Sequence, residues 1–129
     1  MGGEWPSQAC VLVVDDHDAV RAMAVKTLRV RGYAVIEAPG GHEALQAAAV
    51  RDRPIALLLT DVDMPGMNGL ELAHKLIAQR PGLRVLFVSG DPEPSLPPDA
   101  HFLLKPFTPT ALAEAVRRAL ESPAPQADP

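Results

Sequence analysis

The 129-residue sequence has little cysteine, few aromatic residues and no long apolar run. Its single cysteine, Cys10, has no partner for an internal disulfide, which disfavours a disulfide-stabilised secreted domain. No apolar run approaches the roughly 20 residues that a membrane helix needs, and no signal-peptide pattern precedes the first apolar run. We therefore expect no membrane association and a cytoplasmic location.

Positive charge is also scarce. The chain has 12 Lys and Arg residues against 16 Asp and Glu, and its net charge is -4. Because a phosphate backbone attracts basic surfaces, we expect no nucleic acid partner. Hydrophobic residues make up 47% of the chain and aromatic residues only 4%, which indicates one globular domain with an aliphatic core.

Proline is abundant in two segments that we expect to lack regular structure. Residues 122–129 are rich in proline and alanine and indicate a disordered tail or linker, after a domain at residues 10–121 and a polar lead-in at residues 1–9. Residues 90–100 contain Pro92, Pro94, Pro97 and Pro98, a density that a regular helix does not tolerate. We expect an irregular, mobile crossover there, with at most one short turn of helix.

Five short apolar runs alternate with stretches of helical periodicity through most of the chain. The runs are residues 11–14, 33–37, 55–60, 85–88 and 102–104. The helical stretches are residues 18–31, 42–51, 68–79 and 108–120, with Asn68 and Thr108 as predicted N-caps of the last two. Alternation of this kind predicts an α/β fold with a doubly wound parallel sheet.

Polar residues end four of the five runs and form one chemical set. They are Asp15, Asp16, Asp61, Ser89 and Lys105. Since ligands of doubly wound sheets bind at the carboxyl ends of the strands, we expect these side chains to meet at one edge. Clustered carboxylates repel unless a cation joins them, and Mg²⁺ accepts carboxylate and phosphate oxygens together.

This set suits transfer of a phosphoryl group onto a carboxylate. Asp61 follows the inferred middle strand and is the predicted nucleophile, giving an aspartyl phosphate. Lys105 is predicted to neutralise charge on the phosphoryl group, and Ser89 to donate a hydrogen bond to it. The backbone carbonyl of Asp63 is a further candidate metal ligand, beside the carboxylates.

Four motifs resemble the receiver domain of two-component response regulators. They are Val-Leu-Val-Val-Asp15-Asp16, Leu-Leu-Thr-Asp61-Val-Asp-Met-Pro65-Gly-Met-Asn-Gly69, Phe-Val-Ser89-Gly90 and Leu-Lys105-Pro106-Phe107, in this order between about Cys10 and Leu120. The resemblance implies a flavodoxin-like fold with a five-stranded parallel sheet in the order 2-1-3-4-5. It also implies phosphotransfer to Asp61 from a histidine kinase or a histidine phosphotransfer protein. It further implies Mg²⁺ at Asp16 and Asp61, with Asp15 assisting, and a coupled movement of Ser89 and Phe102.

The chain departs from this family in one element. Receivers normally carry a fourth helix between the switch hydroxyl and the lysine strand, where this chain has the proline-rich residues 90–100. We therefore expect helix 4 to be absent or reduced, a feature that resembles receivers attached to hybrid sensor kinases. No DNA-binding segment follows residue 120, so we expect output through an unknown downstream protein rather than transcriptional output within this chain.

Two other functions fit part of the pattern. Asp61-Val-Asp63 resembles the nucleophile and acid pair of a Mg²⁺-dependent aspartate-nucleophile phosphatase, but no cap domain accompanies it. A phosphorylation-independent interaction module would keep the fold, but the complete acidic set disfavours it. For the leading hypothesis we expect no turnover of an external substrate, only phosphorylation and dephosphorylation of the chain itself.

Some residues have simpler explanations. The four histidines lack metal-ligand spacing, and we predict structural or solvated roles for His17, His42, His74 and His101. Phe102 is equally compatible with ordinary core packing and with a moving aromatic side chain.

Overall fold

The computed structural model describes residues 9–50 and 54–123. Residues 1–8, 51–53 and 124–129 lie outside the described residues. Most of the predicted lead-in and tail fall there, and so does the predicted end of the second helix at Arg51. The described part of the chain contains no helix that is both long and apolar enough to cross a membrane.

Five strands and four helices form the described structure, within a few residues of the predicted ranges. The strands are β1 (Cys10–Val14), β2 (Ala34–Ala38), β3 (Leu57–Asp61), β4 (Arg84–Ser89) and β5 (His101–Leu104). The helices are α1 (Asp18–Val30), α2 (Gly41–Ala48), α3 (Gly69–Gln79) and α4 (Pro109–Glu121).

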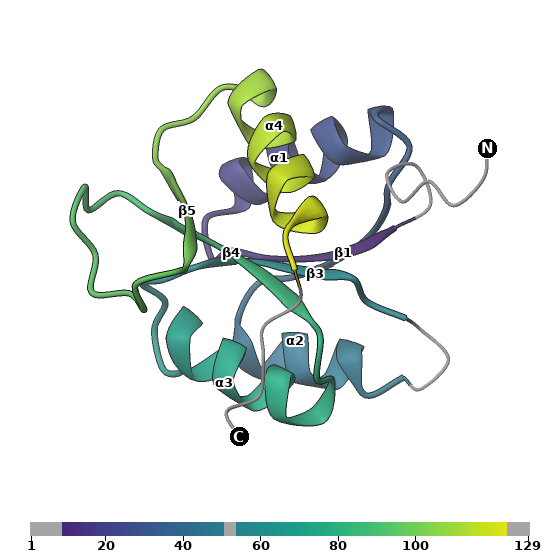
Figure 1. Ribbon diagram of the computed structural model, residues 1–129, viewed down its shortest axis with the longest axis vertical. Coiled ribbons are helices and arrows are strands. Elements are labelled where there is room, and N and C mark those ends of the chain that lie inside the picture. Colours follow the sequence, from purple (N-terminus) through teal and green to yellow (C-terminus); the bar gives the residue numbers. More distant parts are fainter. Residues whose placement is uncertain (1–8, 51–53, 124–129) are drawn as a thin grey trace.

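The strands form one parallel sheet in the order β2-β1-β3-β4-β5. Figure 1 shows α1 and α4 on one face of this sheet and α2 and α3 on the other. The predicted doubly wound, flavodoxin-like fold is thus confirmed. All its strands point the same way, so the residues after β1, β3 and β5 share one edge.

The core consists of two aliphatic layers, one on each face of the sheet. Successive side chains of β3 alternate between them: Leu57 and Leu59 belong to the layer under α1 and α4, whereas Leu58 belongs to the layer under α2 and α3. Every residue of β3 is buried, as its continuous apolar run predicted. Full burial of one such leucine contributes about 2 kcal/mol, so the central strand is firmly held.

Helix ends agree with the local sequence. Asn68 accepts a hydrogen bond from the Glu71 backbone N–H, and the Glu71 side chain accepts one from the Asn68 N–H, so the two form a capping box. Thr108 caps α4 and Pro109 is its first residue. These caps fix where α3 and α4 begin, close to the ends of β3 and β5.

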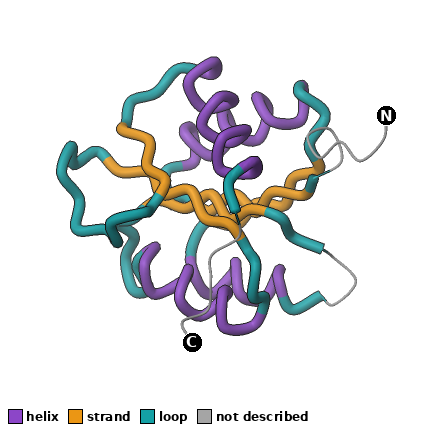
Figure 2. Tube along the Cα trace, in the orientation of Figure 1, coloured by secondary structure: helices purple, strands orange, loops and turns teal. Residues whose placement is uncertain are grey.

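The crossover from β4 to β5 contains no helix. Residues 90–100 form bends and turns, as the prolines predicted, and Figure 2 shows them as a long loop beside β5. Two side-chain bonds anchor its start: the Asp91 N–H donates to Ser89 Oγ at 3.0 Å, and the Glu93 N–H donates to Asp91 Oδ1 at 2.9 Å. Helix 4 of the expected family fold is therefore absent, and α4 is the helix that follows β5.

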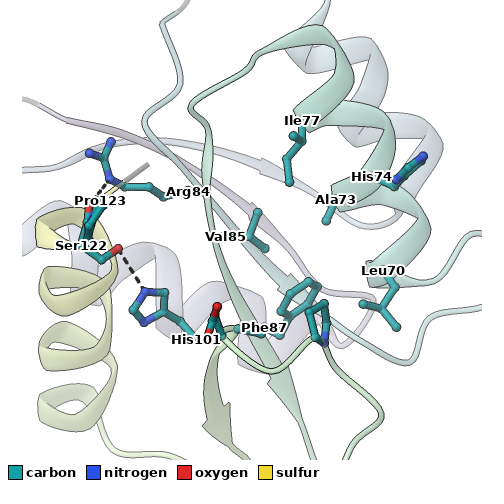
Figure 3. A pocket seen from close by; sticks show the side chains of 13 residues that line it. Leu70, Ala73, His74, Ile77, Arg84, Val85, Phe87, His101, Ser122 and Pro123 are labelled. Carbon is teal, nitrogen blue, oxygen red and sulfur yellow. Dashed lines mark hydrogen bonds between the residues drawn. The ribbon is translucent and has the colours of Figure 1, made fainter. Parts of the chain in front are cut away.

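A cavity of about 720 Å³ lies beside this loop. Apolar side chains from α3 and β4, including Leu70, Ile77 and Val85, line one part of it (Figure 3). At its other end His101 Nε2 and Ser122 Oγ lie 3.1 Å apart, and Arg84 Nε donates to the Ser122 carbonyl at 3.0 Å. The cavity thus lies where the sheet face covered by α2 and α3 has no third helix.

Candidate functional site

Three carboxylates and one ammonium meet at the carboxyl edge of the sheet. Asp15 and Asp16 follow β1, Asp61 ends β3, and Lys105 follows β5. The Lys105 backbone N–H donates to the Ser89 carbonyl at 2.8 Å, which ties the end of β5 to the end of β4. Parallel register therefore brings together residues that are distant in the sequence, as the strand ends predicted.

Lys105 lies between two buried carboxylates. Its Nζ is 3.0 Å from Asp15 Oδ2 and 3.4 Å from Asp61 Oδ2. The Asp15 and Asp61 side chains are only 6% and 3% exposed, and that of Lys105 is 16% exposed. In such a poorly solvated place the ammonium offsets carboxylate repulsion more strongly than it would in water.

Burial raises the pKa of the Asp61 carboxyl above its ordinary value of 3.8. The charge of Lys105 opposes this shift, and the charge of Asp15 adds to it. A weaker lowering effect comes from the Asp63 backbone N–H, which donates to Asp61 Oδ1 at 3.4 Å. Added positive charge at this edge would therefore favour the ionised Asp61 that a nucleophile requires.

The carboxylates of this edge fit a hard divalent ion. Asp15, Asp16 and Asp61 each offer one oxygen and the His17 ring offers one nitrogen, and these four atoms lie within 4.8 Å of one another. Asp16 Oδ1 is buried and has no hydrogen-bond partner among the described residues, although its side chain as a whole is 30% exposed. An ion would satisfy this oxygen, so the residues present are suited to Mg²⁺.

Ser89 and Asp63 lie beside the acidic group rather than in it. The Ser89 side chain is fully buried, and its hydroxyl lies 3.5 Å from Asp63 Oδ2 while accepting from the Asp91 N–H. The carboxylate of Asp63 is not part of the group of possible metal ligands around Asp61. The structure therefore places Ser89 near the site, with its hydroxyl already hydrogen-bonded to Asp63 and Asp91.

Phe102 lies on β5, one strand away from Ser89. It is half-buried, and in the sheet register it is paired with Phe87 of β4. The two interpretations from the sequence, core packing and a moving side chain, both agree with partial burial.

Sequence reasoning missed two residues at this edge. His17 Nδ1 lies 3.1 Å from Asp15 Oδ1, although its side chain is 62% exposed, as a solvated histidine would be. Arg21 donates to the Asp15 carbonyl at 2.7 Å and to Glu37 Oε1 at 3.2 Å, so it holds the end of β1 against β2. The position of His17 directly after the paired aspartates was the available signal, and Arg21 gave none beyond its helix position.

The receiver family accounts for nearly all the described structure. The model of the response regulator receiver domain matches residues 11–117, and the chain belongs to this family. It is 41% identical to the sensor kinase CckA of Brucella abortus over 119 residues, which are 88% of this chain but 13% of the kinase. It is also 35% identical to the response regulator receiver protein CpdR of the same species, over 75% of this chain and 84% of CpdR.

Solved structures give the same result. The receiver domain of the hybrid histidine kinase CckA is 40% identical, with a TM-score of 0.77 over 88% of this chain and all of that domain. The chemotaxis protein CheY4 of Vibrio cholerae is 31% identical, with a TM-score of 0.77 over 87% of this chain and 98% of CheY4. The resemblance seen in the sequence is confirmed.

Proposed function

We propose that this chain is a phosphoacceptor switch whose Asp61 takes a phosphoryl group from a histidine kinase or a histidine phosphotransfer protein in a Mg²⁺-dependent reaction. The main support is one arrangement: a buried Asp61 ends the central strand, with Lys105 Nζ 3.4 Å from its Oδ2 and Asp15 beside both. Family membership supports it too, and so does Asp16 Oδ1, which has no hydrogen-bond partner in the described part of the chain.

The proposed step moves one phosphoryl group between two side chains. A carboxylate oxygen of Asp61 forms a bond to phosphorus while the phosphorus–nitrogen bond of the donor histidine breaks, and the bonding electrons stay on the imidazole nitrogen. Lys105 balances the charge of the phosphoryl oxygens. Asp16 and Asp61, assisted by Asp15, would hold Mg²⁺, which supplies further positive charge to those oxygens when bound.

The signal would leave the site through Ser89. Its hydroxyl now makes a long contact of 3.5 Å with Asp63 Oδ2, so little is lost when it turns to donate to a phosphoryl oxygen. Because Ser89 ends β4 and its carbonyl accepts from Lys105, such a movement reaches the end of β5, the strand that also carries Phe102. We propose that a downstream protein binds differently to these two states.

The phosphatase alternative has less support. It needs the Asp63 carboxyl as an acid beside Asp61, but that carboxylate lies near Ser89 and is exposed. We therefore propose that no external substrate is turned over and that water removes the phosphoryl group from Asp61. The sequence prediction of a cytoplasmic location agrees with a kinase donor of this kind.

Beryllofluoride, a mimic of a phosphoryl group, tests this proposal. In amide NMR spectra with Mg²⁺, it should shift the signals of Ser89 and Lys105 in the wild type and leave those of Asp61→Asn unchanged. A folded wild-type protein that does not respond would contradict the proposal. Turnover of p-nitrophenyl phosphate by the protein with Mg²⁺ would instead support the phosphatase alternative.

A further inference from the structure

The His17 ring reaches three carboxylates at once. Its Nδ1 lies 3.1 Å from Asp15 Oδ1, 3.5 Å from Asp16 Oδ1 and 3.9 Å from Asp61 Oδ2. These are the carboxylates that the proposed function assigns to Mg²⁺, so any role of His17 in metal binding rests on that proposed function. A nitrogen donor thus stands at a site otherwise built from oxygen donors.

Neither helix capping nor core packing explains this position of the ring. His17 is the N-cap residue of α1, with extended backbone angles of φ -90° and ψ 109°, yet its side chain caps no backbone N–H. Its side chain is 62% exposed, so it is not a core residue. The ring is instead held by two contacts of its Nδ1, with Asp15 Oδ1 at 3.1 Å and with Lys105 Nζ at 3.4 Å. In the loop between β1 and α1, the His17 backbone N–H also donates to Asp15 Oδ1 at 2.8 Å.

The spacing of the donor atoms suits a shared ion. Around an octahedral ion with bonds of about 2.1 Å, neighbouring ligand atoms lie about 3 Å apart and opposite ones about 4 Å apart. The three distances from His17 Nδ1, between 3.1 and 3.9 Å, fall within this range. Asp16 Oδ1, a buried oxygen with no hydrogen-bond partner among the described residues, lies 3.5 Å from the same nitrogen.

The identity of the donor atoms then selects the ion. Mg²⁺ prefers oxygen ligands, whereas imidazole nitrogen favours first-row transition ions such as Zn²⁺ and Ni²⁺. We propose that His17 makes this site a mixed nitrogen–oxygen site, which binds Zn²⁺ or Ni²⁺ more tightly than Mg²⁺ at the same carboxylates. His17 is then a residue that determines metal specificity.

Calorimetric titration of the full, untagged chain with NiCl₂ and separately with MgCl₂ tests this assignment. His17→Asn should lower the affinity for Ni²⁺ about tenfold or more and change that for Mg²⁺ less than about twofold. His74→Asn is the matched control, because it removes an exposed imidazole on α3 away from the site and should change neither affinity. In nitrogen NMR of the wild type, Zn²⁺ should shift the ring signals of His17 and not those of His74.

Two results would overturn the assignment. Equal Ni²⁺ affinity for the wild type and His17→Asn would show that the ring is no ligand. Equal losses for Ni²⁺ and Mg²⁺ would show that His17 only positions Asp15. Neither result bears on the proposal that Asp61 accepts a phosphoryl group. That proposal has its own test and is contradicted if beryllofluoride and Mg²⁺ leave the wild-type NMR spectrum unchanged.

Discussion

Lys105 Nζ lies 3.4 Å from Asp61 Oδ2, although β4 separates their strands in the sheet. The lysine therefore reaches across the end of β4, where Ser89 is located. The Ser89 carbonyl accepts a hydrogen bond from the Lys105 backbone N–H. The ion pair between Lys105 and Asp61 is therefore connected to Ser89 through the ends of β4 and β5. A change at Asp61 can in this way act on β4 and β5 together.

Removing the charge of Lys105 should slow phosphorylation strongly. We expect Lys105→Gln to lower the rate of labelling by acetyl phosphate about a hundredfold, the size typical for loss of one electrostatic partner in a buried site. Lys75→Gln removes the same charge from an exposed position on α3 and should leave the rate unchanged. Radioactive labelling of the wild type and of both folded variants measures these rates. If Lys105→Gln were labelled as fast as the wild type, Lys105 would have no role in phosphorylation.

Asp61→Asn should stabilise the protein at neutral pH by about 1 kcal/mol, a size common for single substitutions. Burial raises the pKa of Asp61 above 3.8, so the native state binds that proton more tightly than the unfolded chain does. The resulting stability is fully present below about pH 3.8 and is lost as the pH rises through the folded-state pKa. Asparagine does not titrate, so the advantage of the variant should grow across this pH window.

Urea unfolding of wild type and Asp61→Asn at several pH values measures this difference. The advantage of the variant should shrink as the pH falls toward 3.8. A variant that is less stable than the wild type at neutral pH would show that the pairing with Lys105 outweighs burial. An advantage that is independent of pH would assign the effect to something other than the charge of Asp61.

Much of this arrangement could be predicted from the sequence because its physical causes are local or periodic. Apolar runs and helical periodicity identified every strand and helix, and the polar residues after β1, β3 and β5 predicted the shared edge. The prolines in residues 90–100 predicted that helix 4 is absent or reduced, and the structure has no helix there. Helix caps followed from Asn68 and Thr108 for the same local reason.

The missed features depend on side-chain directions that no periodic pattern encodes. His17 is one residue beyond the paired aspartates, and its ring is held toward them by contacts of Nδ1 with Asp15 Oδ1 and Lys105 Nζ. Arg21 reaches the Asp15 carbonyl through a long side chain, a contact between a helix and a strand end. The engagement of Ser89 with Asp63 likewise depends on the path of the loop after β3.

Gly69 should tolerate no side chain. A Cβ there would collide with the backbone carbonyl of Asp61, which cannot move without shifting the end of β3. We expect Gly69→Ala to lower the free energy of unfolding by about 1–3 kcal/mol. A Cβ at Gly90 meets nothing within 4 Å, so Gly90→Ala is the control and should be nearly neutral. If Gly69→Ala and Gly90→Ala were equally stable in urea unfolding, the close approach of Gly69 to the Asp61 carbonyl would be contradicted.

The crossover at residues 90–100 should be mobile. It contains no helix, and few of its amides are paired within secondary structure. In hydrogen exchange we expect the amides of Ser95, Leu96 and Asp99 to exchange far faster than those of β3, which is buried throughout. Protection equal to that of β3 would show that the loop is as firmly held as the sheet.

Phosphorylation of Asp61 is the central claim, and mapping the label tests it most directly. The chain is incubated with acetyl phosphate and Mg²⁺, and its intact mass is measured. Borohydride then reduces the acyl phosphate to an alcohol with release of phosphate, which marks the phosphorylated aspartate as homoserine, and the digested chain is analysed by mass spectrometry. We predict one phosphoryl group per chain and homoserine at position 61, both absent from Asp61→Asn. Labelling at another residue, or undiminished labelling of Asp61→Asn, would contradict the account.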